Sequence, residues 1–375
     1  MKIAVNTRFL IANHLEGIGN FTLQIVKDLV DQYPSYHFYL IYDRKTPPLI
    51  KSKNVTNLYL LPSARHPILW YIWFEWRLPR LLKKHQIQKF ISPDGFVSLR
   101  LHIPSLIVVH DLAYLVFPQH LPLLVKWYYQ YFTPKFLAEA QLIVTVSRFV
   151  KNHIIESFSL PSDKIKISNN LPKALFQPLD PNTISLTQHQ YAQSCPYFLY
   201  VGAIHPRKNI LRLLLAFQQF KQECPSNMKL VIVGRKAWKN TNLKELPKNP
   251  FYKEEIIWTS KISDSELTKV LGAAFAMLYP SLFEGFGIPI LEAQKAGVPV
   301  ITSKTSSMPE VTGEGGLLVD PIKIEEIVSA MKQVYKDSQL RKKLIEKGFE
   351  NLNRYTKEIA ITPFSEWMEE SGGEN

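Results

Sequence analysis

The sequence of 375 residues predicts an α/β protein made of two doubly wound domains in tandem. Strand-like runs alternate with helical stretches along nearly the whole chain, which is typical of this class. Most of the runs are continuously apolar, as expected for parallel strands covered on both faces. This alternation of strands and helices is interrupted once, near the middle of the chain, and then resumes. At roughly 150 residues per domain, the length also agrees with two domains.

The first half holds seven strand-like runs separated by helical stretches such as "GNFTLQIVKDLVDQY" and "SRFVKNHIIESF". These runs are predicted strands of the first sheet: "KIAVN" (2–6), "HFYLIY" (37–42), "NLYLL" (57–61), "KFIS" (89–92), "SLIVVH" (105–110), "LIVTVS" (142–147) and "KIKIS" (164–168).

The interruption covers residues 171–195, a polar stretch with three prolines, which is typical of a linker. After it, six further predicted strands form the second sheet: "YFLYVG" (197–202), "KLVIVG" (229–234), "IIWTS" (256–260), "FAMLYPS" (275–281), "PVITS" (299–303) and "GLLVD" (316–320). We therefore expect an N-terminal domain (1–180), a linker (181–195), a C-terminal domain (196–352) and a C-terminal helical segment (353–375) that packs back on the first domain. Ligands of such sheets bind at the carboxyl ends of the strands, so we expect the site in an interdomain cleft.

Composition excludes several classes of protein. Cys195 and Cys224 are the only cysteines, too few for a disulfide framework or a metal cluster. The start of the sequence resembles no signal peptide and no run is apolar enough to span a bilayer, so we expect a cytoplasmic location.

The net charge of +13 is concentrated in the first half, where residues 1–190 hold 21 Lys and Arg against 11 Asp and Glu. This excess suits a membrane surface, nucleic acid or an anionic ligand, or it serves solubility alone.

Residues 280–292, "PSLFEGFGIPILE", place two carboxylates around a glycine-rich turn. The run follows a predicted strand, and Pro289 suits the first turn of a helix that Gly297 and Pro299 end. Glycine allows a close approach of the backbone to a ligand, and a helix N-terminus favours phosphate. Carboxylates are good acceptors for hydroxyl groups. Phosphates and hydroxyls together indicate a nucleotide sugar, the alternative being a turn with two surface glutamates.

A second motif, "YVGAIHPRKNI" (200–210), places Arg207 and Lys208 between a strand and a helical run. A bidentate guanidinium beside a point charge is typical of a diphosphate clamp. Two exposed loop cations are the plainer interpretation.

With these motifs the second half resembles the retaining glycosyltransferases of family 4, which have the GT-B fold. The resemblance rests on the Glu-x7-Glu segment in "PSLFEGFGIPILEAQKAGVPVITSKTSSMPEV" and on the "VGAIHPRKN" turn. The first half agrees at "LPRLLKK" (78–84), "VVHDLAYLVFP" (109–118) and "IVTVSRFVK" (143–151), so the resemblance covers essentially the whole chain.

The resemblance implies a donor site in the second domain. Glu292 would hold the ribose hydroxyls, and Arg207 with Lys208 the diphosphate. Glu284 would hold the donor sugar together with the backbone of Gly285, Phe286, Gly287 and Ile288.

It also implies roles in the first domain. His110 would lie near the reacting carbon, at the end of a strand. Gly17 and Gly19, in "EGIGNF", would approach the diphosphate or the acceptor. The plainer interpretation of His110 is a packed strand end. A Gly-x-Gly motif is weak evidence of function by itself.

The expected reaction is transfer of a sugar from a nucleotide diphosphate sugar to a glycan or lipid-linked acceptor, in polysaccharide assembly. The resemblance implies retention of configuration, and it leans toward GDP-mannose. The sequence has no Asp-x-Asp and no His/Cys cluster, so we expect no metal and no cofactor. Two alternatives stay open: a nucleotide-sugar epimerase on the same scaffold, and a non-enzymatic basic binding protein. No nucleic-acid-binding motif supports the latter.

The stretch "ILWYIWFEWRLPRLLKK" (68–84) is aromatic and ends in cations, like a helix that lies on a membrane surface. The resemblance implies instead a buried helix of the first domain. Peripheral contact with the inner membrane surface and core packing are the two interpretations.

Overall fold

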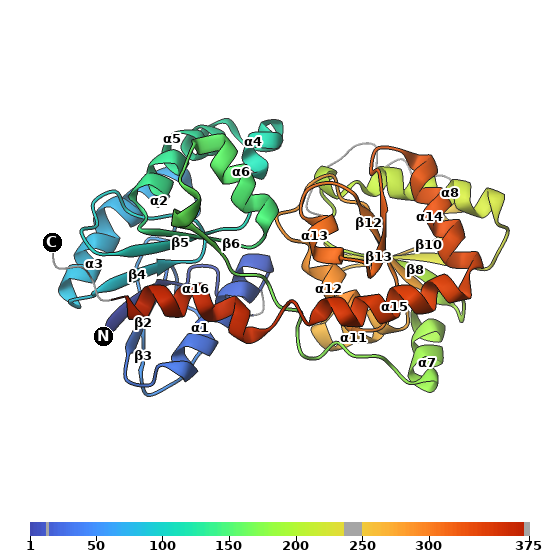
Figure 1. The fold of residues 1–375 in the computed structure, drawn as a ribbon, viewed down its shortest axis with the longest axis horizontal. Helices are drawn as coiled ribbons and strands as arrows, with labels where there is room; N and C mark the ends of the chain where they lie inside the picture. Colours follow the sequence, from blue (N-terminus) through green and yellow to red (C-terminus); the bar gives the residue numbers. More distant parts are fainter. Residues whose placement is uncertain (13–14, 236–249, 371–375) are drawn as a thin grey trace. The chain divides into compact units, whose positions relative to one another are not determined.

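The computed structural model describes residues 1–12, 15–235 and 250–370, which divide into two compact units. Unit 1 consists of residues 1–170 and 356–375, and unit 2 of residues 171–355. In each unit helices cover both sides of a sheet, as Figure 1 shows. The two parallel-sheet α/β domains expected from the sequence are confirmed.

Unit 1 has a seven-stranded parallel sheet in the order β3-β2-β1-β4-β5-β6-β7. All seven predicted strands form, and the largest difference is a shift of two residues at β3. The bounds are β1 Lys2–Asn6, β2 His37–Tyr42, β3 Val55–Tyr59, β4 Lys89–Ser92, β5 Ser105–Val109, β6 Leu142–Thr145 and β7 Ile165–Ile167.

The helices of unit 1 differ in regularity. The predicted helix over 68–84 consists of two α-helical pieces joined by a π-helical turn. The bounds are α1 Gly17–Gln32, α2 Pro67–Ile72, η1 Trp73–Arg77, α3 Leu78–Lys84, α4 Ala113–Val116, η2 Pro118–His120, α5 Leu123–Glu139, α6 Arg148–Phe158, η3 Ser162–Lys164 and α16 Lys357–Glu369.

The C-terminal helix α16 packs on unit 1. Phe364 approaches Phe21 of α1 with ring centroids 6.3 Å apart, and Ser168 Oγ donates to the carbonyl of Ala360 at 2.6 Å. The ammonium group of Lys89 donates to the carbonyl of Trp367 at 2.6 Å. These contacts join α16 to Ser168, which lies 192 residues before its partner in the chain, and to Lys89, which lies 278 residues before its partner.

Unit 2 has a six-stranded parallel sheet in the order β10-β9-β8-β11-β12-β13. All six predicted strands form. The bounds are β8 Tyr197–Val201, β9 Lys229–Val233, β10 Ile256–Thr259, β11 Ala276–Tyr279, β12 Val300–Ser303 and β13 Gly316–Val319. The helices are α7 Pro181–Ala192, η4 Pro206–Lys208, α8 Ile210–Glu223, α10 Pro250–Glu255, α11 Asp264–Gly272, α12 Ile288–Lys295, α13 Met308–Thr312, α14 Ile324–Lys336 and α15 Ser338–Leu352.

The stretch 181–195 differs from the linker that its polar composition suggested, because most of it forms α7 inside unit 2. Asp180 caps this helix by accepting a hydrogen bond from the amide of Thr183 at 3.0 Å, and Pro181 occupies the first turn. Thr187 and Ala192 are buried, and Gln188 Nε2 donates to the carbonyl of Ala273 at 3.3 Å, so the helix is docked in unit 2 although most of its positions are not buried. The boundary between the units falls at Asn170 and Leu171 instead.

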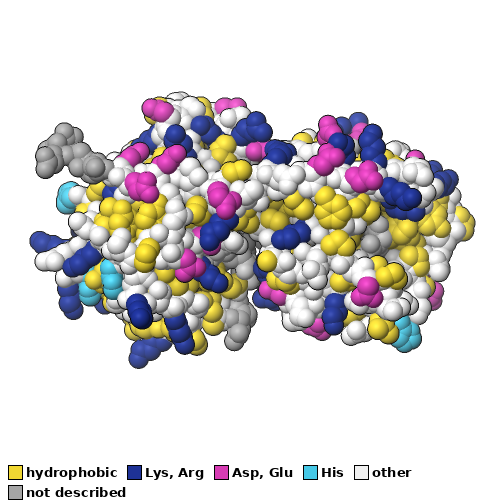
Figure 2. Space-filling view, turned by 60° about the horizontal axis from the view of Figure 1, so that its bottom comes forward, with side chains coloured by type: hydrophobic (Ala, Val, Ile, Leu, Met, Phe, Trp, Pro, Cys, Tyr) yellow, Lys and Arg dark blue, Asp and Glu magenta, His cyan; other side chains and the backbone are white. Residues whose placement is uncertain are grey.

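The surface carries mixed charge. On the face of unit 1 seen at the left of Figure 2, Lys and Arg side chains gather along the lower edge, while Asp and Glu lie above them. Within the described residues, no helix combines the length and the apolar character that crossing a membrane requires.

Candidate functional site

The central feature of unit 2 is a cluster of charged and phenolic groups at the carboxyl ends of two neighbouring strands. Arg207 and Lys208 lie in the turn η4, which follows β8, and Glu284 lies in the loop that follows β11. Because β8 and β11 are adjacent in the sheet, residues far apart in sequence meet at one edge.

Glu284 is the anion of this cluster and is buried, with 6% of its surface exposed. Lys208 donates a hydrogen bond to its Oε1, and Arg207 Nη1 lies 3.6 Å from its Oε2. The hydroxyl of Tyr279 also donates to Oε1, at 3.0 Å. Burial acts to raise the pKa of Glu284, but Lys208 and Arg207 outweigh it and hold the pKa below its ordinary value. The glutamate is therefore an anion at neutral pH.

The two cations are not the exposed loop cations of the plainer interpretation. Their side chains are 25% exposed for Arg207 and 12% for Lys208. Lys208 Nζ lies 3.0 Å from the hydroxyl of Tyr279, and Arg207 donates to the carbonyl of Phe283 at 3.3 Å. Because Arg207 and Lys208 lie in a turn, their side chains were expected to be exposed. In the structure, β11 and the loop after it supply partners that cover both side chains.

The turn that carries the cations is fixed to the β11 loop through its backbone. The amide of Leu282 donates to the carbonyl of Arg207 at 2.7 Å. Asn209, which begins α8 in the left-handed region at φ 61°, donates to the carbonyls of Pro280 and Pro321. These bonds hold Arg207 and Lys208 against the loop that presents Glu284.

The glycine-rich loop is also held from the third strand of this edge. Ser307, beyond β12, donates to the carbonyls of Glu284 and Phe286, both at 2.9 Å. Gly287 adopts φ 98°, in the region that favours glycine, and begins α12. Gly285 and Phe286 are buried, Ile288 is half-buried, and the helix ends before Gly297 as expected. The glycine-rich loop is thus a strand-to-helix connection that hydrogen bonds hold in place.

Glu292 differs from Glu284 in its surroundings. It lies on α12 with 7% of its surface exposed, and within the described part of the chain its carboxyl group has no hydrogen bond or ion pair. Burial raises its pKa to about 7, against a small lowering by the charge of Lys173. A buried carboxyl group without a hydrogen-bonding partner is costly, and a ligand that donates hydroxyl groups would relieve that cost.

In unit 1, His110 follows β5 and is half-buried. Its Nε2 donates to the carbonyl of Pro93 at 2.8 Å, and Phe21 meets its ring edge-on at 5.1 Å between centroids. Burial lowers the pKa of His110, partly offset by the bond to Pro93 and the charges of Asp111 and Asp94. The imidazole is therefore neutral at pH 7 and its Nε2 is engaged.

The two glycines at the start of α1 have different surroundings. A Cβ on Gly19 would lie 2.7 Å from the carbonyl oxygen of Phe9, whereas one on Gly17 would meet nothing within 4 Å. Close packing alone accounts for Gly19. Gly17 is exposed at the helix N-terminus, and packing does not require glycine there.

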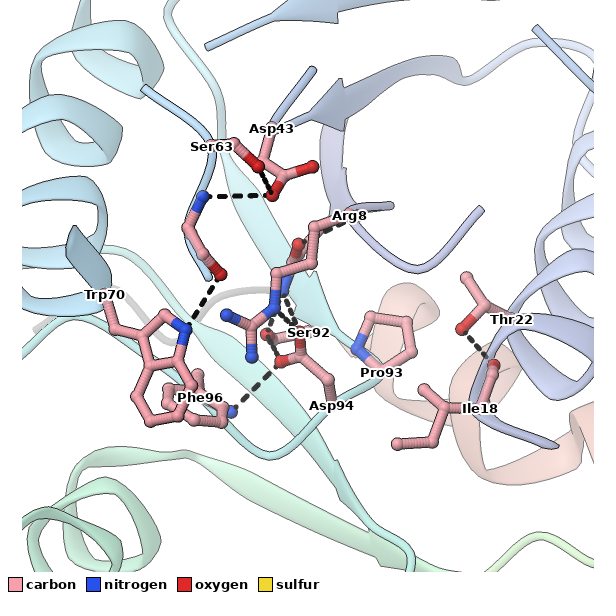
Figure 3. A network of polar contacts seen from close by, with 12 residues as sticks. Arg8, Ile18, Thr22, Asp43, Ser63, Trp70, Ser92, Pro93, Asp94 and Phe96 are labelled. Atoms are coloured by element: carbon pink, nitrogen blue, oxygen red, sulfur yellow. Dashed lines mark hydrogen bonds and ion pairs between the residues drawn. The ribbon is translucent and has the colours of Figure 1, made fainter. Parts of the chain in front are cut away.

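A buried ion pair near His110 gave no signal in the sequence. Arg8, just beyond β1, lies 2.5 Å from the carboxylate of Asp94, just beyond β4 (Figure 3). Asn6 donates to the same carboxylate at 2.8 Å, and Ser92 donates to its other oxygen at 3.1 Å. Arg8 and Asp94 lie 86 positions apart in the sequence, so only the adjacency of β1 and β4 reveals this pair.

No metal site accompanies these groups: within residues 1–12, 15–235 and 250–370, no set of three His, Cys, Asp or Glu side chains could hold an ion. The site therefore offers two cations, one anionic carboxylate and one unpartnered carboxyl group at a single edge of unit 2.

Two family models and a mannosyltransferase are similar to this chain. Residues 15–170 match the family model "Glycosyltransferase Family 4", and residues 186–351 match "Glycosyl transferases group 1". The chain is 28% identical over 360 residues to O-antigen chain mannosyltransferase B of Escherichia coli, covering 93% of this chain and 94% of that protein.

Two solved structures have the same fold. Sucrose-phosphate synthase of Thermosynechococcus elongatus superposes with a TM-score of 0.78 at 17% identity, over 98% of both chains. Anabaena HepE in complex with UDP-glucose superposes with a TM-score of 0.75 at 15% identity, over 98% of this chain and 99% of that one.

Proposed function

Because the chain belongs to the glycosyltransferases of family 4 with the GT-B fold, we propose that it transfers mannose from GDP-mannose to a glycan or lipid-linked acceptor, with retention of configuration. That it is a glycosyltransferase follows from the family. The donor, the acceptor and the stereochemistry are the proposal. The observation that carries it is the cluster of Arg207, Lys208 and Glu284 at the carboxyl ends of β8 and β11.

In the proposed donor complex, Arg207 and Lys208 bind the diphosphate. The guanidinium offers a planar fork to two oxygens, while the ammonium group acts as a point charge. Both cations are preorganised against Glu284, so little reorganisation is needed when negative charge develops on the leaving phosphate. Glu284, an anion held in place by these cations, accepts hydrogen bonds from hydroxyl groups of the sugar.

Glu292 binds the ribose in the same proposal. Its carboxyl group is buried on α12 and lacks a hydrogen bond in the described chain. Two ribose hydroxyls would supply the missing donors and favour the ionised form. The amides at Phe286 and Gly287, at the N-terminal end of α12, complete the donor site.

In the chemical step, the bond between the anomeric carbon and the diphosphate oxygen breaks, and the acceptor hydroxyl oxygen forms a bond to that carbon on the same face. The acceptor's proton passes to the leaving phosphate, so no protein carboxylate has to act as nucleophile or base. His110, neutral and held by Pro93, is assigned to the acceptor side of this reaction.

We further propose that the reaction needs no metal ion. Two partly buried cations beside the proposed diphosphate site supply the positive charge that magnesium supplies to other transferases.

The sugar is proposed from the relative named as a mannosyltransferase, which aligns with nearly the whole chain. Its name also suggests the setting, assembly of a surface polysaccharide. The HepE structure, in complex with UDP-glucose, supports a nucleotide sugar as the class of donor.

A panel of nucleotide sugars and nucleotide diphosphates in a thermal-shift assay tests the donor. GDP and GDP-mannose should raise the melting temperature more than the uridine and adenine compounds do. If oligonucleotides raise the melting temperature and no nucleotide diphosphate does, the result would instead favour a basic binding protein.

A further inference from the structure

Helix α5 of unit 1 exposes an apolar stripe. Leu123, Trp127 and Tyr131 recur every four residues and are 84%, 54% and 48% exposed. The adjacent stripe is equally apolar but faces the core, with Tyr128, Phe132 and Phe136 buried. A helix that covers one core normally has a polar outer face. The outer face of α5 therefore calls for an explanation other than the packing of this unit.

Helix α2 and the turn η1 extend the stripe into a patch. Tyr71 of α2 lies 5.9 Å from Phe132 of α5, measured between ring centroids, and Trp127 lies 6.3 Å from the same ring. Figure 1 shows the two helices beside each other. We define the α2–α5 patch by its exposed members: Ile68, Tyr71, Ile72, Trp76, Leu123, Leu124, Trp127 and Tyr131.

Cations border this patch. Lys135 lies 3.5 Å above the ring of Tyr131, and Arg80 and Arg100 lie 5.6 and 4.5 Å from the ring of Trp76. Segments 66–84 and 113–139, which carry the patch, contain six Lys and Arg and two Glu. Glu75 is buried and accepts a hydrogen bond from the amide of Leu99, and Glu139 is exposed at the last residue of α5. The surface of both segments is therefore mainly apolar, with more cations than carboxylates.

We propose that the α2–α5 patch docks onto the surface of an anionic lipid bilayer. Tryptophan and tyrosine side chains suit the boundary between headgroups and acyl chains, and cations at the rim attract anionic headgroups. A second copy of the chain fits less well, because a symmetric contact would bring two cationic surfaces together.

The inner faces of the same helices line the proposed acceptor side. Tyr129 of α5 stacks on Tyr114, four residues after His110, with centroids 5.1 Å apart. Trp70 of α2 meets Phe96, just beyond β4, at 5.5 Å. Docking would hold the ends of β4 and β5 close to the lipid surface. If the proposed function holds, that arrangement presents a lipid-linked acceptor to unit 1.

Co-sedimentation with sucrose-loaded vesicles tests the proposal. The full chain should bind vesicles of phosphatidylcholine and phosphatidylglycerol in equal parts, bind phosphatidylcholine alone poorly, and dissociate as salt is added. The double variant Leu123→Ser/Trp127→Ser should bind at least about tenfold more weakly. Arg80→Gln/Lys135→Gln should bind roughly 25-fold more weakly, since each cation near an anionic surface contributes about fivefold.

Matched controls come from unit 2. Leu186, 71% exposed on α7, serves as Leu186→Ser, and the exposed α15 pair serves as Lys342→Gln/Lys343→Gln. Both should bind as the parent chain does, and circular dichroism should show every variant folded. Transfer to a water-soluble acceptor should survive the patch substitutions, which separates this proposal from the proposed function.

Absence of binding to anionic vesicles, or equal binding to both kinds, would overturn the proposal. A second result would also overturn it: the parent chain is a dimer in solution and does not bind vesicles, and Leu123→Ser/Trp127→Ser makes it monomeric. The patch would then be a protein interface.

Discussion

Lys208 donates a hydrogen bond to Glu284, a residue 76 positions further along the chain. Tyr279 donates to the same carboxylate oxygen, so the ammonium, the phenol and the carboxylate form one connected group. The pair arises because β8 and β11 are adjacent in the sheet of unit 2. In the proposed donor complex, Lys208 binds the diphosphate and Glu284 accepts hydrogen bonds from the sugar hydroxyls.

Replacing Lys208 should slow the reaction more than it weakens donor binding. Charge on the leaving oxygen is larger in the transition state than in the bound donor, so Lys208→Ala should lower kcat more than it raises the donor KM. The expected loss in kcat is about 10²–10³-fold. Lys208→Arg should recover only part of the rate, since a fork differs in shape from a point charge. Steady-state kinetics measure both constants.

The same substitution should also destabilise the fold, because it removes one partner of a buried carboxylate. Adding Glu284→Gln to Lys208→Ala should restore stability without restoring rate. Lys332→Ala, which breaks an exposed ion pair with Glu223, is the control and should alter neither. A folded Lys208→Ala variant with near-normal kcat would contradict the assignment.

Replacing Glu292 should weaken the binding of nucleotide diphosphates. The proposed pair of charge-assisted hydrogen bonds to ribose would be lost in Glu292→Ala, at a cost of about 1.5–3 kcal/mol. Titration calorimetry with GDP measures the change. A matched titration of Glu346→Ala, an exposed glutamate on α15, should give the parent affinity. Equal affinities for all three chains would remove the ribose role.

Glu292 should also make the ligand-free chain less stable as pH rises. Its pKa is raised from 4.5 to about 7 by burial, so the native state binds the proton more tightly than the unfolded state. No penalty exists below pH 4.5. Between about pH 4.5 and 7 the free energy of unfolding falls, by up to about 3 kcal/mol in total.

Urea unfolding at pH 5 and pH 8 checks this sign, both values lying roughly at the ends of that window. Glu292→Gln should be close to the parent chain at the lower pH and clearly more stable at the higher one. Glu346→Gln should shift stability equally at both. If Glu292→Gln is destabilising at the higher pH, the carboxylate has a stabilising partner in solution and the unpaired assignment fails.

Excess chelator should leave the activity unchanged. The reason is the pair of cations at the proposed diphosphate site, which makes a bound metal unnecessary. The measurement compares initial rates in EDTA with rates in added magnesium or manganese. Abolition by EDTA with rescue by either metal would show that Arg207 and Lys208 do not suffice.

Much of this architecture could be predicted from local sequence. The apolar runs locate all thirteen strands of the described residues, since a buried parallel strand needs a continuous apolar stretch whatever its neighbours are. The turn at Lys208 and the loop at Glu284 were visible because glycine, proline and charge cluster there. That Lys208 and Glu284 meet follows only from strand order, which no local pattern contains.

Other features required tertiary contacts. The Arg8–Asp94 ion pair joins the ends of two strands more than 80 residues apart. Helix α7 lacks a clear apolar stripe and is stabilised by its Asp180 cap and two buried positions. In α5, sequence alone does not distinguish the buried Phe132 from the exposed Tyr131 next to it, because both are aromatic.

The most direct test of the central claim is a transfer assay with GDP-mannose, in which released GDP is measured and the new linkage is identified by NMR. With a mannose-containing oligosaccharide as acceptor, the chain should release GDP in step with product, and the product should keep the α configuration of the donor. Lys208→Ala should abolish most of both signals, while Lys332→Ala should abolish neither. Acceptor-dependent release with an inverted product, or full activity in Lys208→Ala, would contradict the proposed mechanism.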